Sequence, residues 1–284
     1  MKEVYIEIVL AVAPDPALRE LISFQLHEWG CTGFLEDDLS IHCYLQKPRW
    51  TEILNKKLSA FIAEEEPAVV SLSSIAEIAN ENWNLQWEET IQPIEAGERF
   101  IIAPSWHPVD AKEGKIVVTI DPKMSFGTGY HESTRLMLRM LEKHGSARPH
   151  VLDVGTGTGI LAIAAAKLGS IHVVGIDVDE WSYSNARENV EKNGCGGIVE
   201  IHFGSLEVVA ETGFDMILAN ITRTAILELL PSLVQKLRKE GVILCSGLMT
   251  EDRSSVEDAL RQEGCALLSG ATENEWIGIA AVRE

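Results

Sequence analysis

The sequence predicts a doubly wound α/β domain preceded by a small ferredoxin-like α+β domain. Over the last two thirds of the chain, helical segments alternate with continuous Val/Ile/Leu strands, which is typical of a parallel sheet covered on both faces. The first 80 residues follow a different order of elements. With 284 residues, the chain is also longer than one average domain.

Residues 1–80 follow the order strand, helix, strand, strand, helix, strand. Apolar residues alternate from Val4 to Leu10, as in a half-buried strand. Apolar residues at helical spacing follow Pro16, and Gly30 ends that helix. A hairpin, a second helix and a last strand are predicted over residues 33–46, 50–67 and 69–79. This order predicts the ferredoxin-like domain.

The composition changes over residues 81–100, which we predict to be a linker helix carrying Trp83 and Trp87. The second domain is expected over residues 101–284. Its predicted strands cover residues 99–106, 115–122, 151–155, 172–178, 198–205, 214–221, 242–247 and 275–284, with residues 264–270 pairing in a final hairpin. Its predicted helices cover residues 133–144, 160–169, 180–194, 224–241 and 254–264.

The net charge restricts the kind of binding partner that we expect, and the cysteines restrict the cellular compartment. The net charge is −19, which argues against direct nucleic-acid binding and favours a basic partner. The first 100 residues are the more acidic part, with 18 acidic and 7 basic side chains. Five cysteines without a CxxC pair indicate a reducing, cytoplasmic location and argue against a disulfide framework or a metal site. We find no membrane-length apolar run and no signal peptide. The sequence leaves the oligomeric state open.

A glycine-rich turn joins the strand at residue 151 to the next helix. Gly155, Gly157 and Gly159 alternate there, so the third glycine comes one residue earlier than in the dinucleotide fingerprint. Glycine adopts positive φ at low cost and lets a ligand approach the backbone. Asp153 precedes the turn and can hold the loop or the polar end of a ligand. Asp177 ends the next strand, where an acid can bind both ribose hydroxyls. These residues predict a nucleoside site without a pyrophosphate cradle.

The segments DVGTGTG and GIDVD resemble those of the seven-stranded, Rossmann-like class I methyltransferases, which bind S-adenosyl-L-methionine (AdoMet). The resemblance implies that the three glycines pass under the cofactor and that Asp177 takes its ribose hydroxyls. The predicted final hairpin also matches that family.

Two further segments narrow the resemblance. Phe126–Gly129 is followed by His131, Ser133 and Thr134, which we interpret as a tight turn leading to a helix capped by Ser133 or Thr134. Asn220 follows the fourth strand of the sheet, where its carbonyl could accept a hydrogen bond from an amine nucleophile.

Together with the NWNLQW segment, these motifs resemble the bacterial methyltransferases that trimethylate amines of large-subunit ribosomal protein eleven. The resemblance implies that Thr134, Gly155, Asp177 and Asn220 contact the cofactor, and that Phe126 covers it. It also implies that Asn220 lies near the accepting amine, and that residues 1–80 recognise a basic ribosomal protein. His131 is the nearest candidate general base, although packing in the turn is the favoured role. Tyr130, Glu132 and Thr156 depart from the usual pattern without affecting the fold.

Other functions remain open from the sequence. A small-molecule methyltransferase could use the same cofactor site. A nucleic-acid amino-methyltransferase is disfavoured because Ile221-Thr222-Arg223 follows Asn220 in place of Pro-Pro-aromatic. A non-enzymatic AdoMet-binding protein and an NAD-dependent dehydrogenase are the remaining alternatives, and the glycine spacing disfavours the dehydrogenase.

Overall fold

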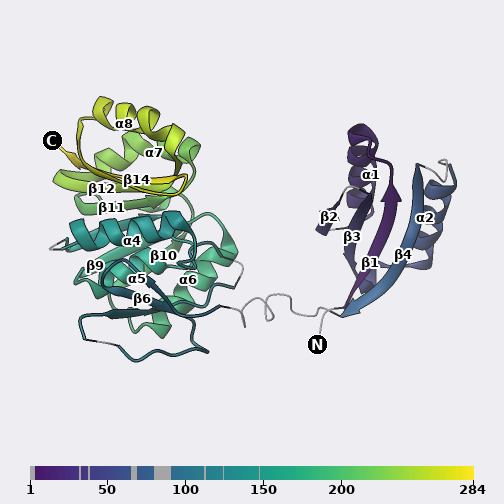
Figure 1. Cartoon of the computed structure of the whole chain (residues 1–284), viewed down its shortest axis with the longest axis horizontal. Helices are drawn as coiled ribbons and strands as arrows, with labels where there is room; N and C mark the ends of the chain where they lie inside the picture. Colours follow the sequence, from purple (N-terminus) through teal and green to yellow (C-terminus); the bar gives the residue numbers. More distant parts are fainter. Residues whose placement is uncertain are drawn as a thin grey trace. The chain divides into compact units, whose positions relative to one another are not determined.

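The chain divides into two compact units, Met1–Gln86 and Trp87–Glu284, in the computed structural model (Figure 1). The structure describes residues 4–31, 33–37, 39–64, 69–79, 91–111, 113–123, 125–146 and 148–284. Trp83, Trp87 and the whole segment NENWNLQWEET lie outside these residues.

The first unit has the predicted ferredoxin-like topology. Its elements are β1 (Val4–Val12), α1 (Pro16–Glu28), β2 (Gly33–Glu36), β3 (Ser40–Gln46), η1 (Lys47–Arg49), α2 (Glu52–Glu64) and β4 (Val70–Ala79). The strands pair antiparallel in the order β2-β3-β1-β4. Alternate residues of β1 are buried, and they pack with Ile22 and Leu26 of α1 and Leu58 of α2.

The second unit contains a seven-stranded sheet in the order β10-β9-β8-β11-β12-β14-β13. All its strands are parallel except β14, which runs antiparallel to both neighbours. The strands are β8 (His150–Val154), β9 (His172–Asp177), β10 (Val199–Phe203), β11 (Phe214–Asn220), β12 (Leu237–Met249), β13 (Cys265–Glu273) and β14 (Trp276–Arg283). The predicted Rossmann-like sheet and its final hairpin are therefore confirmed.

Helices cover both faces of this sheet. The helices are α4 (Glu132–His144), α5 (Ile160–Lys167), α6 (Glu180–Lys192), α7 (Arg223–Lys236) and α8 (Arg253–Gln262), with short turns η2 (Leu206–Val208) and η3 (Thr250–Asp252). Apolar residues of α4, α5 and α6 form one core with Val151 and Val173, whereas α7 and α8 form a second core with Leu152 and Val174. Neighbouring residues of one strand thus face opposite layers, as the pleat requires.

A small sheet of three strands packs against α4 and α5. It consists of β5 (Ile94–Ala96), β6 (Phe100–Ala103) and β7 (Ile116–Thr119). The predicted linker helix is wrong where the structure describes it, because residues 94–96 form the strand β5, which pairs antiparallel with β6. Ala96 and Phe100 are fully buried in the core of the second unit, so the described part of this segment belongs to that unit.

The helix predicted over residues 224–241 ends earlier than expected. Leu237 is 1% exposed and pairs with Phe214, so the chain has already joined β12 at that residue. The hydrogen bonds of the strand ladder exclude continued helix there. All five cysteines are buried and free. Within the described residues, no helix is long and apolar enough to span a bilayer, and no His/Cys/Asp/Glu cluster could hold a metal ion.

Candidate functional site

The glycine turn between β8 and α5 has a backbone that few other residues could adopt. Gly155, Gly157 and Gly159 have φ values of 69°, 56° and 83°. A Cβ on Gly155 would lie 2.3 Å from the side chain of Ile221, and one on Gly157 would lie 2.3 Å from the carbonyl oxygen of Phe126. The first two glycines are therefore required for close approach as well as for positive φ.

Gly159 has a different neighbour. A Cβ on this residue would meet Ala186 of α6 at 3.3 Å. Gly159 is also the N-cap of α5 and has a left-handed conformation. Its position therefore favours a role in packing α5 against α6.

Asp153 holds the turn from inside the protein. Its side chain is 0% exposed, and its Oδ2 accepts hydrogen bonds from Thr156 Oγ1 at 2.6 Å and from the Ala162 amide at 3.2 Å. Its Oδ1 has no hydrogen-bond partner among the residues that the structure describes. Burial raises the pKa of Asp153 to about 7, more than the two hydrogen bonds lower it, and the charge of Asp177 raises it further.

Asp177 lies at the carboxyl end of β9, directly beside the glycine turn. Its Oδ2 accepts a hydrogen bond of 2.8 Å from the Gly157 amide, and its Oδ1 accepts one of 3.0 Å from the Asp179 amide. An ionised carboxylate has about four acceptor positions. Asp177 therefore keeps about two of these positions for hydroxyl groups of a ligand.

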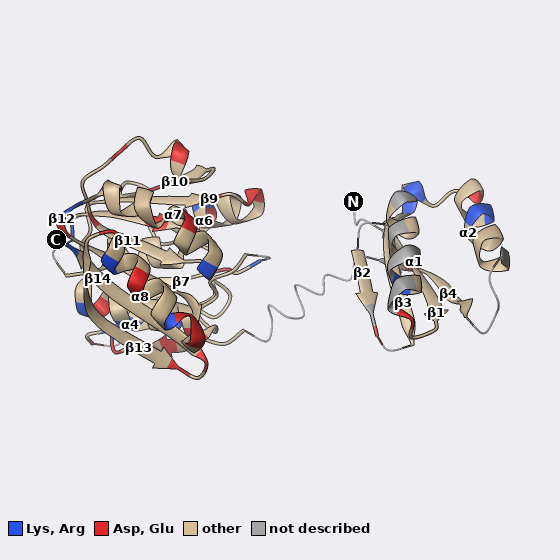
Figure 2. Ribbon diagram, turned by 90° about the horizontal axis from the view of Figure 1, so that it is seen from above, with Lys and Arg blue, Asp and Glu red and all other residues tan. Residues whose placement is uncertain are grey.

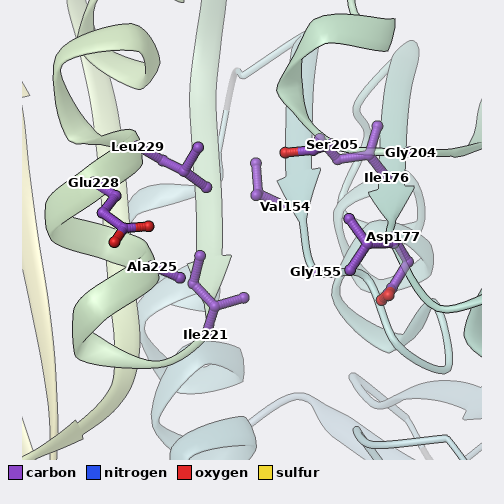
Figure 3. Close-up of a pocket in the computed structure, with 11 residues that line it drawn as sticks. Val154, Gly155, Ile176, Asp177, Gly204, Ser205, Ile221, Ala225, Glu228 and Leu229 are labelled. Atoms are coloured by element: carbon purple, nitrogen blue, oxygen red, sulfur yellow. The ribbon is translucent and has the colours of Figure 1, made fainter.

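A cleft of about 270 Å³ opens beside these residues (Figure 3). Its walls come from the ends of β8 and β9, the turn after β10, and the first turns of α7. The lining residues are Val154, Gly155, Ile176, Asp177, Val178, Gly204, Ser205, Ile221, Ala225, Glu228 and Leu229. The chain passes from β10 to β11 with only the short turn η2 between them, so no α-helix fills this face of the sheet beside α7.

Asn220 and Thr134 meet at the end of the next strand. Asn220 is the last residue of β11, and its Nδ2 donates to Thr134 Oγ1 at 3.5 Å. Thr134 is fully buried in the first turn of α4. The Oδ1 of Asn220 is buried and, within the described part of the chain, has no hydrogen-bond partner. An unsatisfied buried acceptor is costly in a folded protein, so its presence here points to a ligand donor.

The N-cap of α4 differs from the prediction of Ser133 or Thr134. The cap is His131, whose Nδ1 accepts from the Ser133 amide at 3.2 Å and lies 2.8 Å from Ser133 Oγ. Ser133 and Thr134 lie inside the helix and are fully buried. The helix therefore begins earlier than predicted, because its cap lies two residues before Ser133.

The ring of His131 lies between two other aromatic side chains. Its centroid is 5.1 Å from that of Phe126 and 4.5 Å from that of Trp276, the first residue of β14. Phe126 is 53% exposed, so part of its ring is available to a ligand. Its carbonyl oxygen accepts from the Thr158 amide at 2.9 Å, which joins this aromatic group to the glycine turn.

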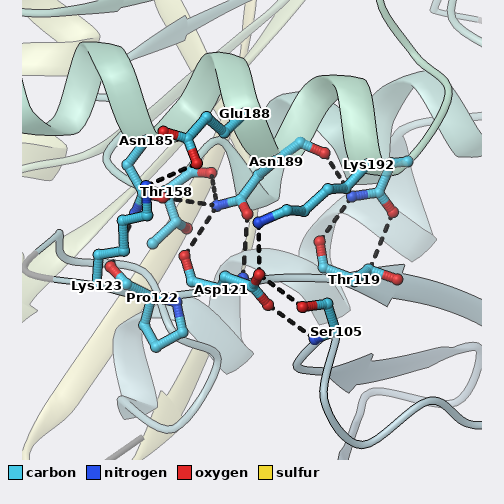
Figure 4. Close-up of polar contacts among 11 residues, drawn as sticks. Ser105, Thr119, Asp121, Pro122, Lys123, Thr158, Asn185, Glu188, Asn189 and Lys192 are labelled. Carbon is cyan, nitrogen blue, oxygen red and sulfur yellow. Dashed lines mark hydrogen bonds and ion pairs between the residues drawn. The ribbon is translucent and has the colours of Figure 1, made fainter. Parts of the chain in front are cut away.

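Three asparagines at and after α6 hold the segment before Phe126 in place, two of which, Asn185 and Asn189, are labelled in Figure 4. Asn185 and Asn189 of α6 and its C-cap Asn193 recur every four residues, and they donate to the carbonyl oxygens of Pro122, Asp121 and Thr119, respectively. The Asp121 carboxylate also accepts hydrogen bonds from Ser105 and forms an ion pair of 2.5 Å with Lys192. Burial alone would raise the pKa of Asp121, but these partners outweigh it and lower the pKa.

The structure gathers the eight predicted site residues at the carboxyl ends of β8, β9 and β11. Gly155 and Asp177 line the cleft, whereas the other six are not among its lining residues. The sequence analysis missed Trp276, because nothing local indicates that β14 brings it to His131. It also missed Gly204 and Ser205, although their position after a predicted parallel strand was a usable signal.

Comparison with known families agrees with this geometry. The family model "Ribosomal protein L11 methyltransferase (PrmA)" matches residues 17–284. A ribosomal protein L11 methyltransferase of Chlorobaculum tepidum is 36% identical over 274 residues, which cover 95% of this chain and 94% of that protein. One of Syntrophomonas wolfei is 31% identical over 302 residues, covering 97% and 98% of the two chains.

A solved structure shows the same relationship. The crystal structure of ribosomal protein L11 methylase from Lactobacillus delbrueckii subsp. bulgaricus matches with a TM-score of 0.64 and 31% identity. The match covers 68% of this chain and 100% of that chain. From the site geometry, the family match and these relatives, the chain belongs to the ribosomal protein L11 methyltransferase family.

Proposed function

We propose that this protein transfers methyl groups from AdoMet to amines of ribosomal protein L11, with lysine side chains as acceptors. The observation that carries the proposal is the meeting of the glycine turn, Asp177 and Asn220 at the ends of three adjacent strands. The family match over residues 17–284 supports the donor and the protein substrate.

The residues fit an adenosine bearing a cationic amino-acid group. Gly155 and Asp177 line the cleft, and the free acceptor positions of Asp177 suit ribose hydroxyls. The cleft walls are largely aliphatic, with Val154, Ile176 and Leu229 suited to a flat base. Gly157 carries no Cβ, which lets the Phe126 carbonyl approach the glycine turn, and its amide donates to Asp177 at 2.8 Å. Asp153 supports the turn from behind.

The bound cofactor supplies an electrophilic methyl group. The protein positions the amine, and alignment alone can contribute about 7–11 kcal/mol to such a reaction. A lysine amine has an ordinary pKa of about 10.4, so it must lose its proton before it can attack. The unpartnered Oδ1 of Asn220 can accept an N–H of that amine and orient its lone pair, while Thr134 holds the amide.

We assign a structural role in the turn to His131, and we infer that solvent removes the proton from the lysine amine. Its Nδ1 is already engaged by the Ser133 amide and hydroxyl, so only Nε2 is available for other roles. Its ring also lies between Phe126 and Trp276. Aromatic faces attract alkylammonium groups by about 0.5–2 kcal/mol. This aromatic cluster is therefore suited to bind a methylated amine at the entrance of the site.

We assign substrate recognition to the first unit and methyl transfer to the second. Acidic side chains occur on both units (Figure 2), and residues 1–100 carry 18 acids and 7 bases. Such an excess favours association with a basic protein. The free, buried cysteines support a reducing compartment, so we place the reaction in the cytoplasm.

Mass spectrometry of L11 incubated with enzyme and AdoMet tests the proposal. We expect mass increases in steps of one methyl group, located by fragmentation on amines. An Asp177→Ala enzyme should give much less product at limiting AdoMet. An unmodified L11, with AdoMet bound by the wild-type enzyme, would contradict the substrate assignment and favour a small-molecule acceptor.

A further inference from the structure

Four large apolar side chains are exposed where β9 and β10 end. They are Val178, Trp181, Phe203 and Val208, which are 69%, 76%, 53% and 42% exposed, respectively. We call these four residues the β9–β10 rim. Single exposed apolar residues are common on protein surfaces, but a group at one edge of a functional cleft indicates an interaction site.

The backbone places the members of the rim close together. Phe203 of β10 pairs with Asp177 of β9, so it lies beside the start of the Val178–Trp181 segment. A Cβ on Gly204, the residue after Phe203, would lie 2.5 Å from Val208. The ring of Phe203 also lies 6.0 Å from that of Tyr183 on α6. The rim is therefore one surface built from two strand ends and the start of α6.

The rim borders the candidate cofactor cleft. Val178 and Gly204 line that cleft, and the Gly204 amide donates to the carbonyl oxygen of Asp177, the residue before Val178, at 2.8 Å. Trp181 follows Val178 by three residues, in the first turn of α6, and is not among the residues that line the cleft. A macromolecule that covers Trp181 would thus lie beside the place where the methyl donor is proposed to bind.

The charges around the rim indicate which kind of partner could bind there. Asp179, Glu180 and Glu207 are exposed beside it, whereas Arg187 lies 5.5 Å from the ring centroid of Tyr183 and His202 pairs with Glu200. A second copy of this chain, with net charge −19, would be repelled here. Nucleic acid would be repelled for the same reason. A basic protein complements both the apolar and the acidic character.

We propose that the β9–β10 rim is a docking surface for a basic protein, with Trp181 as its central contact. The proposal rests on the proposed function, because it makes this protein the methyl acceptor. Tryptophan is enriched among the few residues that dominate protein–protein affinity.

Binding of ribosomal protein L11 to the full-length enzyme tests this surface without requiring turnover. We would measure the Kd by fluorescence anisotropy of labelled L11 for wild type, Trp181→Ala and Phe203→Ala. Ile171→Ala is the matched control, because Ile171 is 64% exposed but precedes β9 at its opposite end. We expect Trp181→Ala to weaken L11 binding about tenfold or more, and Ile171→Ala to leave it unchanged. Higher ionic strength should also weaken wild-type binding.

Two further measurements on each variant complete the test: its AdoMet affinity by calorimetry and its thermal unfolding. Both should match wild type for Trp181→Ala. Unchanged L11 affinity in both rim variants would overturn the proposal, as would a wild-type enzyme that does not bind L11. A parallel loss of AdoMet affinity would also overturn it, by assigning Trp181 to the cofactor site. Rim-dependent L11 binding without methyl transfer would support the surface and contradict the proposed function instead.

Discussion

Asn189 donates a hydrogen bond of 2.9 Å from its side-chain amide to the carbonyl oxygen of Thr158 in the glycine turn. The same amide accepts from the Asp121 N–H at 3.0 Å and donates to the Asp121 carbonyl at 3.2 Å (Figure 4). Asn189 is 0% exposed. One buried side chain of α6 therefore joins the glycine turn to the segment that follows β7.

Replacing Asn189 with alanine should destabilise the second unit. The change leaves the Thr158 carbonyl and the Asp121 amide without these buried partners, and each unsatisfied group costs about 1–3 kcal/mol. We expect a loss of about 2–4 kcal/mol in the free energy of unfolding, measured in urea. Ser184→Ala on the exposed face of the same helix should change it by less than about 0.5 kcal/mol. Equal stability of the two variants would show that the asparagine does not hold these segments.

Alanine at Gly157 should distort the glycine turn. The new Cβ would lie 2.3 Å from the carbonyl oxygen of Phe126, so one of the two segments must move. Gly194 is a matched control, because its φ of 66° is close to the 56° of Gly157 and a Cβ there would meet nothing within 4 Å. Gly194→Ala should carry only the left-handed backbone cost of about 1–2 kcal/mol. We expect Gly157→Ala alone to lose AdoMet affinity in calorimetry; similar affinities in the two variants would rule out the steric argument.

The ribose assignment predicts a measurable role for Asp177. Asp177→Ala should weaken AdoMet binding by roughly 1–3 kcal/mol, the range for hydrogen bonds to a charged group. Glu180→Ala removes a nearby exposed acid that does not line the cleft, so its AdoMet affinity should equal that of wild type. Isothermal titration of both variants separates a specific contact from a general effect of charge. An Asp177→Ala enzyme with wild-type affinity would remove the assignment.

The sequence predicted the sheet and the glycine turn because both depend on local patterns. Continuous apolar strands, the spacing of Gly155 and Gly157, and the acid at Asp177 all lie within short segments that determine their own structure. Strand ends of a parallel sheet meet at one edge, so these residues had to come together. The same reasoning predicted the position of Asn220 at the end of β11.

Other parts of the site depend on contacts between segments far apart in the chain. Trp276 reaches His131 only because β14 lies between β12 and β13, and its local sequence does not show this. The cap of α4 was mispredicted because His131 replaces the usual Ser or Thr when its ring is held by Phe126 and Trp276. The early end of α7 reflects the pairing of Leu237 with Phe214. In each case, a tertiary contact overrides a local preference.

Asn220 should affect catalysis more than cofactor affinity. Asn220→Ala removes the buried Oδ1 that is proposed to orient the amine, while Thr134 stays in its helix. We expect kcat with L11 to fall by about 10- to 100-fold, the equivalent of about 1.5–3 kcal/mol. Thr134→Val, which removes only the hydroxyl, should have a smaller effect. Steady-state kinetics at saturating AdoMet measure this difference, and an unchanged kcat for Asn220→Ala would exclude the role.

The buried carboxyl of Asp153 predicts a pH dependence of stability. Burial raises its pKa to about 7 in the folded protein, whereas the ordinary value for an unfolded chain is about 3.9. The folded state therefore binds more protons between these values, so the contribution of Asp153 to stability decreases as the pH rises from about 4 to about 7. The change should be on the order of a few kcal/mol.

The variant Asp153→Asn isolates this contribution, because an amide does not titrate. The unfolding free energy of wild type, relative to that of Asp153→Asn, should decrease across the same pH window and become constant above it. Asp179 provides the opposite case, since hydrogen bonds from Ser182 lower its pKa. The unfolding free energy of wild type, relative to that of Asp179→Asn, should therefore decrease as the pH falls below about 4. Urea titrations over this pH range measure both differences. A wild-type curve that runs parallel to that of Asp153→Asn would show that the Asp153 carboxyl ionises normally, and that the glycine turn does not depend on its protonation.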